Sequence, residues 1–308
     1  MCSSLSIVIP VINEEQHLTN LLADIDGQRD IRADVVVVDG GSTDESISIA
    51  QRMGARVRCA PRGRATQMNA GTRRAEQELL LFLHADSRLP DPRLLDRAIR
   101  DWQSKASNLG HRRLAGHFQL RFRNSEAGSR RWIYRFLEAK SALNRPYTFN
   151  GDQGLLIHRS FLRSLGGFDE SLPFLEDQRI GGQIHRLGDW ITLDGTVSTS
   201  TRRFDEEGFW PRYIMMGLMV AAMAAEADEF FASLPQLYQI QSEASDLKLR
   251  DFAAPLVSLG CDLESTRISQ IAAAVARCIS DNAWQLPFLA RLFFFGSRSG
   301  APGVNGVQ

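Results

Sequence analysis

The chain of 308 residues contains few cysteines and no excess of charge of either sign. Lys+Arg and Asp+Glu both total 36, so the formal net charge is zero. A general nucleic-acid binder needs a strong positive charge, and we therefore expect no nucleic-acid partner. The cysteines form no CxxC pair and no zinc-ligand pattern with histidine, which indicates free thiols in a reducing compartment. They are Cys2, Cys59, Cys261 and Cys278.

Long hydrophobic runs are also absent. The N-terminus has no basic segment, and its apolar run, Ile7–Ile12, is too short for a signal peptide and contains Pro10. The most apolar stretch, Ile214–Ala225, has 12 residues, whereas a membrane-spanning helix needs roughly 20. We therefore predict a cytoplasmic location and a buried or interfacial helix at that stretch.

Two nucleotide-binding fingerprints are missing as well. The chain has no G-x-G-x-x-G after its first apolar run and no G-x-x-x-x-G-K anywhere. Their absence argues against a dinucleotide-dependent oxidoreductase and a P-loop ATPase.

The first half of the chain alternates short apolar, β-branched runs with longer amphipathic stretches, which is typical of a parallel sheet covered by helices. The first predicted elements are a strand at Leu5–Ile9, a helix at Glu14–Asp26 and a strand at Asp34–Val38. This order predicts a right-handed parallel crossover. The elements predicted next are a helix ending near Met53, strands Ala55–Cys59 and Leu79–Leu83, and helices Thr66–Glu78 and Arg93–Lys105.

From residue 112 onward the pattern changes, because residues 117–122 alternate like a half-exposed strand. The sheet is therefore expected to become mixed. The later predicted elements are a helix within 124–143, strand Gly154–His158, helices Arg159–Leu165 and Glu176–Leu187, short strands Ile191–Asp194 and Thr196–Ser200, and helices from Phe209 to about 292 with breaks near Pro235, Pro255 and Pro287. This pattern divides the chain into a catalytic domain (1–205), a helical C-terminal extension (206–295) and a disordered tail (296–308).

Polar side chains follow the first, second and fourth predicted strands. Because ligands bind beyond the carboxyl ends of parallel strands, these side chains are candidates for a shared site. Each of them alone could equally cap a helix or form a turn, so their convergence is what favours a site. The residues are Pro10, Asn13, Glu14, Asp39, His84 and Asp86.

A basic segment stands directly before a predicted helix, at residues 62–71. Arg64 lies where the helix N-terminus already attracts anions, which indicates a diphosphate clamp, although a solvated basic turn has the same pattern. Gly71 inside the helix suggests close approach to another backbone or to a ligand.

Five segments, in this order, resemble family 2 glycosyltransferases of the GT-A fold: VIPVINEE, VVVDGGSTD, GRATQMNAG, LFLHADS, and GGFDE followed by ED. The resemblance spans roughly residues 5–205. It implies an α/β, Rossmann-like, mostly parallel sheet with helices on both faces. Within this family, the chain is most similar to the bacterial branch named after radical-SAM and selenium-domain proteins. The segments that carry this similarity are G-R-x-x-Q-M-N-x-G, H-A-D in place of D-x-D, G-D-Q (151–153) and T-S-T-R-R (199–203).

The resemblance also implies roles for individual residues. Pro10, Asn13, Glu14 and Asp39 would line the nucleotide pocket, with Asp39 bonded to the base or ribose, and Arg64 would approach the diphosphate. Asp86 would bind Mg²⁺ or Mn²⁺ between the two phosphates. His84 replaces an aspartate there, and histidine suits Mn²⁺ better than Mg²⁺.

On the opposite side of the cleft, the resemblance implies that the Glu176–Asp177 pair is catalytic, with Asp177 taking the proton from the acceptor hydroxyl. A helix N-terminus that favours acids would explain the same pair. Asp152 is expected on the acceptor side. Arg202 and Arg203 are expected to reach the diphosphate from a loop, although a solvated pair is an equal alternative.

These roles predict an inverting glycosyltransferase with a nucleotide-diphosphate donor, UDP-linked, and an unknown hydroxyl acceptor. A lipid-linked acceptor would fit if the helical extension touched a membrane surface, but residues 205–308 carry 7 basic and 12 acidic side chains, a net −5. The alternatives are a non-catalytic nucleotide-sugar-binding protein and a sugar-phosphate nucleotidyltransferase. The second of these would carry a Gly-rich loop after the first strand, where this chain has Pro-Val-Ile-Asn-Glu-Glu.

Overall fold

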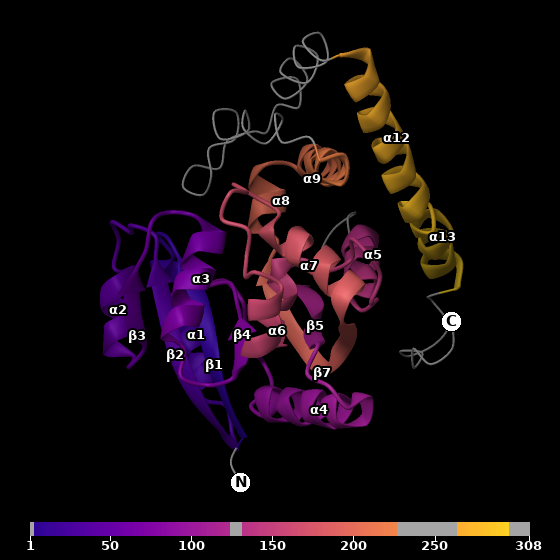
Figure 1. The fold of residues 1–308 in the computed structure, drawn as a ribbon. Helices are drawn as coiled ribbons and strands as arrows, with labels where there is room; N and C mark the ends of the chain where they lie inside the picture. Colours follow the sequence, from indigo (N-terminus) through magenta and orange to yellow (C-terminus); the bar gives the residue numbers. More distant parts are fainter. Residues whose placement is uncertain (1–2, 124–130, 227–263, 296–308) are drawn as a thin grey trace.

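The computed structural model describes residues 3–123, 131–226 and 264–295, and the tail expected at 296–308 lies outside them (Figure 1). Its centre is a seven-stranded sheet in the order β3-β2-β1-β4-β6-β5-β7. The strands are β1 (Ser3–Val11), β2 (Ile31–Asp39), β3 (Arg56–Cys59), β4 (Leu79–Phe82), β5 (Leu114–Arg123), β6 (Leu155–His158) and β7 (Asp189–Ser200).

The sheet is parallel in its first half and mixed in its second. β1 pairs in parallel with both β2 and β4, and β2 pairs in parallel with β3. β6 runs antiparallel to β4 and β5, while β5 and β7 are parallel. Both features confirm the expectations from the sequence.

Helices cover both faces of this sheet. Along β1, Ile7 and Ile9 pack into one hydrophobic cluster with α1 and α4, whereas Val8 packs into a second cluster with α3, α6 and α7. The strands are therefore apolar on both sides, as buried parallel strands require. The helices are α1 (Glu15–Asp26), α2 (Ser46–Arg52), α3 (Arg64–Arg74), α4 (Leu94–Leu109), α5 (Arg131–Ser141), α6 (Arg159–Ser164), α7 (Glu176–Leu187), α8 (Arg202–Glu206), α9 (Phe209–Ala224), α12 (Ser265–Asn282) and α13 (Gln285–Phe295), with a 3₁₀ turn η1 (Gly151–Gln153).

Two boundaries differ from the expected ones. The two short strands expected at 191–194 and 196–200 form the single strand β7, whose register shifts opposite His117 and Gln119. Gly195, at φ 118°, lets the backbone bulge without ending the strand. The C-terminal break falls between α12 and α13, ahead of Pro287. Pro287 lies in the first turn of α13. A backbone N–H there would have no partner within the helix, so proline costs no helical hydrogen bond at this position. The breaks expected near Pro235 and Pro255 lie outside the described residues.

The close approach expected at Gly71 is neither to a backbone nor to a ligand, but to valine side chains of the sheet. A Cβ added there would lie 2.3 Å from Cγ1 of Val8 and 3.0 Å from Cγ2 of Val38. The absence of a side chain thus lets α3 lie directly on β1 and β2, and this brings the N-terminus of α3 to the carboxyl edge of the sheet.

We expect Gly71→Ala to lower the free energy of unfolding by ~1–3 kcal/mol, because the added methyl overpacks the contact with Val8. Urea denaturation measures the change, and adding Val8→Ala should recover part of it. Gly182 is a matched control, because it lies in α7 with no atom within 4 Å of its added Cβ. Gly182→Ala should be neutral or stabilising by ~0.5–1 kcal/mol. Equal destabilisation by the two alanines would contradict the overpacking.

Candidate active site

The loops that follow β1 and β2 are bonded to each other at the carboxyl edge of the sheet. Oδ1 of Asn13 accepts a bond from the backbone N–H of Thr43 at 2.8 Å, and the N–H of Glu14 donates to Oγ of Ser46 at 2.8 Å. Asn13 adopts a left-handed conformation, φ 52°, which asparagine tolerates better than most residues. The two loops thereby form one ledge beside the end of β1, where Pro10 also lies.

Asp39 builds the second of these loops. Its side chain is buried, and its carboxylate accepts bonds from the N–H groups of Gly41 at 2.8 Å and Ser42 at 3.1 Å. The carboxylate oxygens thus shape the turn. Behind the turn, Nε2 of the buried Gln67 donates to the carbonyl oxygens of Val11 and Val38, both at 2.8 Å, and ties α3 to the two strand ends.

The N-termini of α3 and α7 are joined by an ion pair. Nη1 of Arg64 lies 3.0 Å from Oε1 of Glu176, whose side chain is only 2% exposed, compared with 27% for Arg64. The Glu176 carboxylate raises the pKa of Arg64, so the guanidinium is charged at neutral pH. Asn69 holds the same two helices together, because its side chain bonds to the backbone N–H and carbonyl of Phe168 in the turn before α7.

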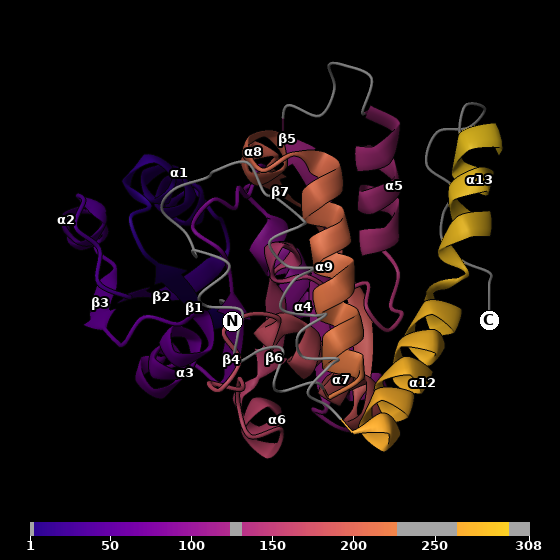
Figure 2. The ribbon, with the colours of Figure 1, turned by 90° about the horizontal axis from the view of Figure 1, so that it is seen from above.

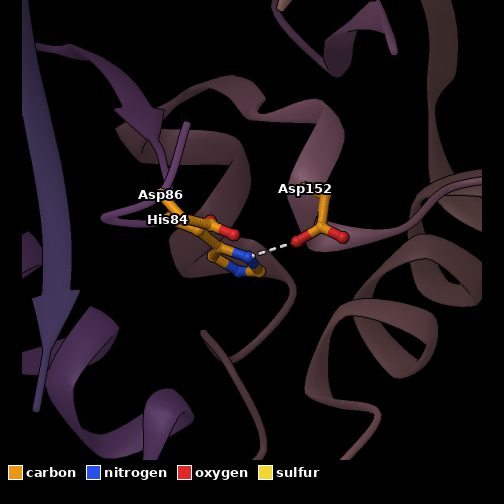
Figure 3. A group of neighbouring side chains, drawn as sticks. All are labelled: His84, Asp86 and Asp152. Atoms are coloured by element: carbon orange, nitrogen blue, oxygen red, sulfur yellow. Dashed lines mark hydrogen bonds and ion pairs between the residues drawn. The ribbon is translucent and has the colours of Figure 1, made fainter. Parts of the chain in front are cut away.

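Three possible metal ligands meet where β4 ends and η1 begins, as Figure 3 shows for His84, Asp86 and Asp152. One ligand atom from each lies within 4.8 Å of the other two. Nδ1 of His84 is 2.6 Å from Oδ1 of Asp152, and Oδ2 of Asp86 accepts a bond from Oγ1 of Thr199 at 3.2 Å. One imidazole and two carboxylates suit Mn²⁺, which accepts nitrogen and oxygen ligands. The sequence placed Asp152 on the acceptor side, whereas here it pairs with His84.

Gly151 lies between this trio and Asp177. Its N–H donates to Oδ2 of Asp177 at 2.7 Å, and a Cβ added to it would lie 2.7 Å from Nε2 of His84 and 3.5 Å from the same Asp177 oxygen. His84 of the candidate metal trio and the candidate base Asp177 therefore both lie next to one glycine. Asp86 and Asp177 thus belong to the same region of the molecule.

Asp177 is an unusually weak acid for an aspartate. Burial and the neighbouring Glu176 carboxylate raise its pKa to about 6, against the opposing effects of Arg64 and of the bonds from the N–H groups of Gly151 and Gln178. A carboxylate of this kind holds a proton more readily than an exposed one, which is what a general base near neutral pH requires.

A buried polar network fixes the η1 turn. Gln153 is fully buried, its Nε2 lies 2.9 Å from Nδ1 of His117 and 2.7 Å from the carbonyl oxygen of Ser141, and its Oε1 accepts the N–H of Asn150 at 2.7 Å. The other ring nitrogen of His117, Nε2, lies 2.7 Å from Oδ1 of Asn144. Neither His117 nor Gln153 was predicted as a site residue from the sequence, although Gln153 ends the G-D-Q segment. The Asn150-x-x-Gln153 spacing is a capping box, and this was the available signal.

The burial of His117 predicts a loss of stability in acid. Burial lowers the pKa of His117 below its ordinary 6.5, so the unfolded chain binds this proton more readily than the native chain. Stability should be constant above that ordinary value and fall by up to ~1.4 kcal/mol per pH unit below it. Urea midpoints at about pH 7.5 and about pH 5.5 measure the effect. His117→Gln should reduce the pH dependence.

Cationic groups surround Asp86. Nη2 of Arg123 donates to the Asp86 carbonyl oxygen at 2.8 Å. The imidazole of His17 has its pKa lowered by burial and by Arg202, and its Nε2 is buried with no hydrogen-bond partner in the described part of the chain. Arg202, at the start of α8, is exposed. The side chain of Arg203 lies outside the described structure. His17 and Arg123 were not identified from the sequence, because only the fold brings α1 and β5 to this loop.

The family described as glycosyl transferase family 2 matches residues 6–166. Among curated proteins, a dolichyl-phosphate hexose transferase of Haloferax volcanii is 38% identical over 96 residues, which cover 30% of this chain and 42% of that protein. An undecaprenyl-phosphate 4-deoxy-4-formamido-L-arabinose transferase of Pseudomonas syringae is 32% identical over 143 residues, covering 36% of this chain and 42% of that protein. The chain thus spans about two fifths of the length of each of these relatives.

Among solved structures, S. aureus TarS 1-349 in complex with UDP superimposes with a TM-score of 0.50 at 13% identity, over 98% of this chain and 95% of that one. At this identity the likeness concerns the fold, and it supports the GT-A architecture expected from the sequence. Among the described residues, no helix combines the length and the apolarity needed to cross a bilayer.

Proposed function

Because the chain belongs to glycosyl transferase family 2 and is a glycosyltransferase, we propose that it transfers a sugar, with inversion, from a UDP-linked donor to a hydroxyl acceptor. The observation that carries this proposal is the shared contact at Gly151, which has both His84 of the candidate metal trio and Asp177 as neighbours. Inverting transfer needs a base close to the reacting sugar in addition to a group that neutralises the leaving diphosphate, and this arrangement brings two such groups together.

In this mechanism Asp177 removes the proton from the acceptor hydroxyl as its oxygen attacks the anomeric carbon. The bond from that carbon to the diphosphate oxygen breaks in the same step, the configuration inverts, and the proton remains on Asp177. No second carboxylate nucleophile is needed, unlike in a retaining enzyme. Glu176 acts beside it by holding Arg64 and by keeping the pKa of Asp177 high.

His84, Asp86 and Asp152 would hold Mn²⁺ or Mg²⁺. A cation bound there would neutralise the charge that develops on the leaving diphosphate. The ledge formed by Asn13, Glu14 and the β2 loop would receive the nucleotide, together with Pro10 and Asp39. Arg64, Arg202 and Arg203 would approach the diphosphate, with α8 able to close over it.

A lipid-linked acceptor is the finer proposal. The two curated relatives are named for dolichyl phosphate and undecaprenyl phosphate. On this chain, α9 exposes Trp210, Ile214 and Leu218 at 56%, 45% and 41%, one helical turn apart. Such a stripe would rest on a membrane surface through apolar contact. Cosedimentation with phosphatidylcholine vesicles tests this, and equal sedimentation of Trp210→Ala and the natural chain would contradict it.

Within the family, the chain is proposed to belong to the branch named after radical-SAM and selenium-domain proteins. The support for this proposal is the H-A-D segment ending at Asp86 and the G-D-Q segment that contains Asp152. The two segments lie side by side in the structure. Asp152 of the G-D-Q segment would therefore compensate for the histidine that replaces the first aspartate of D-x-D.

Calorimetry with UDP and GDP, in the presence of Mn²⁺ or Mg²⁺, tests the proposed function. We expect UDP to bind and the affinity to increase with Mn²⁺. Failure to bind any nucleoside diphosphate would remove the proposal. Binding without hydrolysis of any UDP-sugar in a donor panel would favour the non-catalytic alternative.

A further inference from the structure

Two residues with left-handed backbone conformations stand just before the candidate site carboxylates. Leu175, φ 61°, directly precedes Glu176 and Asp177, and Tyr147, φ 62°, precedes Asp152 in the segment leading to η1. Neither residue is glycine, asparagine or aspartate. A bulky residue in this region costs ~1–3 kcal/mol and persists only where the surrounding structure holds it.

The C-terminal helices cover the first of these residues. Leu172, just ahead of α7, is buried in a cluster with Met215 and Met219 of α9 and Ala274 of α12, and Leu175 packs against this cluster. Figure 1 shows α9 lying over α7. The buried methionines are on the face of α9 opposite its exposed stripe. They therefore hold the segment that ends at the catalytic pair.

The same helices cover the second residue. The guanidinium of Arg145 lies 4.8 Å from the ring centroid of Trp284, at the junction of α12 and α13, and Phe136 of α5 contacts Phe288 of α13 with centroids 6.0 Å apart. Burial raises the pKa of Tyr147, and so do Cys278 and Asp281 of α12. Figure 2 shows α13 beside α5, on the side of the molecule where this segment runs.

We infer that α9, α12 and α13 position both halves of the active site, acting through Leu175 on the candidate base Asp177 and through Tyr147 on the candidate metal ligand Asp152. This inference rests on the proposed function. The helical extension is then a second layer of the catalytic domain. The positioning residues are Met215, Met219 and Trp284, none of which reaches the reacting atoms.

Hydrogen exchange on the full chain tests the positioning directly. In Met215→Ala/Met219→Ala, amides in peptides covering 172–178 should exchange ~10-fold faster, because the cluster that holds Leu175 has lost its centre. In Trp284→Ala, peptides covering 145–153 should respond in the same way. Peptides covering 36–45, on the donor side, should not change in either variant. Gly217→Ala and Leu286→Ala are matched controls, because Gly217 is exposed with no atom within 4 Å of an added Cβ and Leu286 is 73% exposed.

Two further readouts separate this inference from the proposed function. Calorimetry should give the same UDP affinity in EDTA for all variants. UDP-sugar hydrolysis should fall ~10-fold in the two interior variants, at unchanged KM for the donor in Met215→Ala/Met219→Ala. If the natural chain hydrolyses no UDP-sugar, the proposed function fails, and the exchange data still decide the positioning. Unchanged exchange in 145–153 and 172–178, or equal acceleration in 36–45, would overturn the inference.

Discussion

Replacing Asp177 with asparagine should reduce the rate of sugar transfer or donor hydrolysis ~10²–10⁴-fold, the usual effect of removing a positioned general base. Asparagine keeps the shape of the side chain, and its amide oxygen can still accept the N–H of Gly151. Only proton uptake is lost. UDP affinity, measured by calorimetry, should therefore stay within about twofold, because the substitution leaves the donor side untouched.

The pH profile gives this prediction a second signature. Since the pKa of Asp177 is raised to about 6, the rate of the natural enzyme should rise as the pH increases through that value and the base loses its proton. Stability should move the opposite way. The pKa of this carboxyl is 3.8 in the unfolded chain and about 6 in the fold, so its stabilising contribution to the native state is complete only below pH 3.8. This contribution is lost as the pH rises to about 6. Asp177→Asn should abolish the pH dependence of the rate and this contribution to the pH dependence of stability.

Asp26→Asn is the matched control, because Asp26 is exposed at the end of α1. It should change neither the rate nor the pH profile. Equal rates for Asp177→Asn and the natural chain would exclude Asp177 as the base.

The second large effect is expected at the candidate metal ligands. Asp86→Ala should lower the rate roughly 10²–10³-fold and should abolish the gain in UDP affinity that Mn²⁺ produces, because a cation that neutralises a leaving diphosphate contributes several kcal/mol to the reaction. Removing the metal with EDTA should lower the rate of the natural chain to a similar extent. Calorimetry with UDP, with and without Mn²⁺, measures the binding part.

His84→Asp restores the commoner acidic pair and tests the donor set. With only carboxylate oxygens, the site should accept Mg²⁺ about as well as Mn²⁺, whereas the natural chain should prefer Mn²⁺. Thr199→Val serves as the control for the hydrogen bond to Asp86, which is 3.2 Å long. It should leave the metal preference as it is. Full activity of Asp86→Ala in EDTA would contradict a metal role for the trio.

The fold was largely predictable because the strands are buried on both faces. Runs such as Leu79–Phe82 are continuously apolar, and polar residues follow them directly, so both the sheet and its functional edge are visible in the sequence. Parallel pairing then brings the loops after β1 and β2 together. The close approach at Gly71 was predictable as well, but its partner, Val8, became apparent only in the fold.

The contacts within the site were less predictable, because they join residues far apart in the chain. His84 and Asp152 are 68 positions apart, and Arg64 and Glu176 are 112 apart. Local patterns mark each of these residues as polar and as close to a strand or helix end, but they do not specify its partner. Gln153 and His117 are buried within a polar network, and a hydrophobicity pattern has no means of marking a hydrogen-bonded pair.

Gly151 limits how this enzyme can be redesigned. A methyl group at that position would meet the imidazole of His84 at 2.7 Å and reach the Asp177 carboxylate at 3.5 Å, so any larger residue disturbs both neighbours at once. Engineering for a new cation and engineering for a new acceptor are consequently not independent tasks in this scaffold. Libraries should hold position 151 fixed, and beneficial changes on one flank should be retested whenever the other flank is altered.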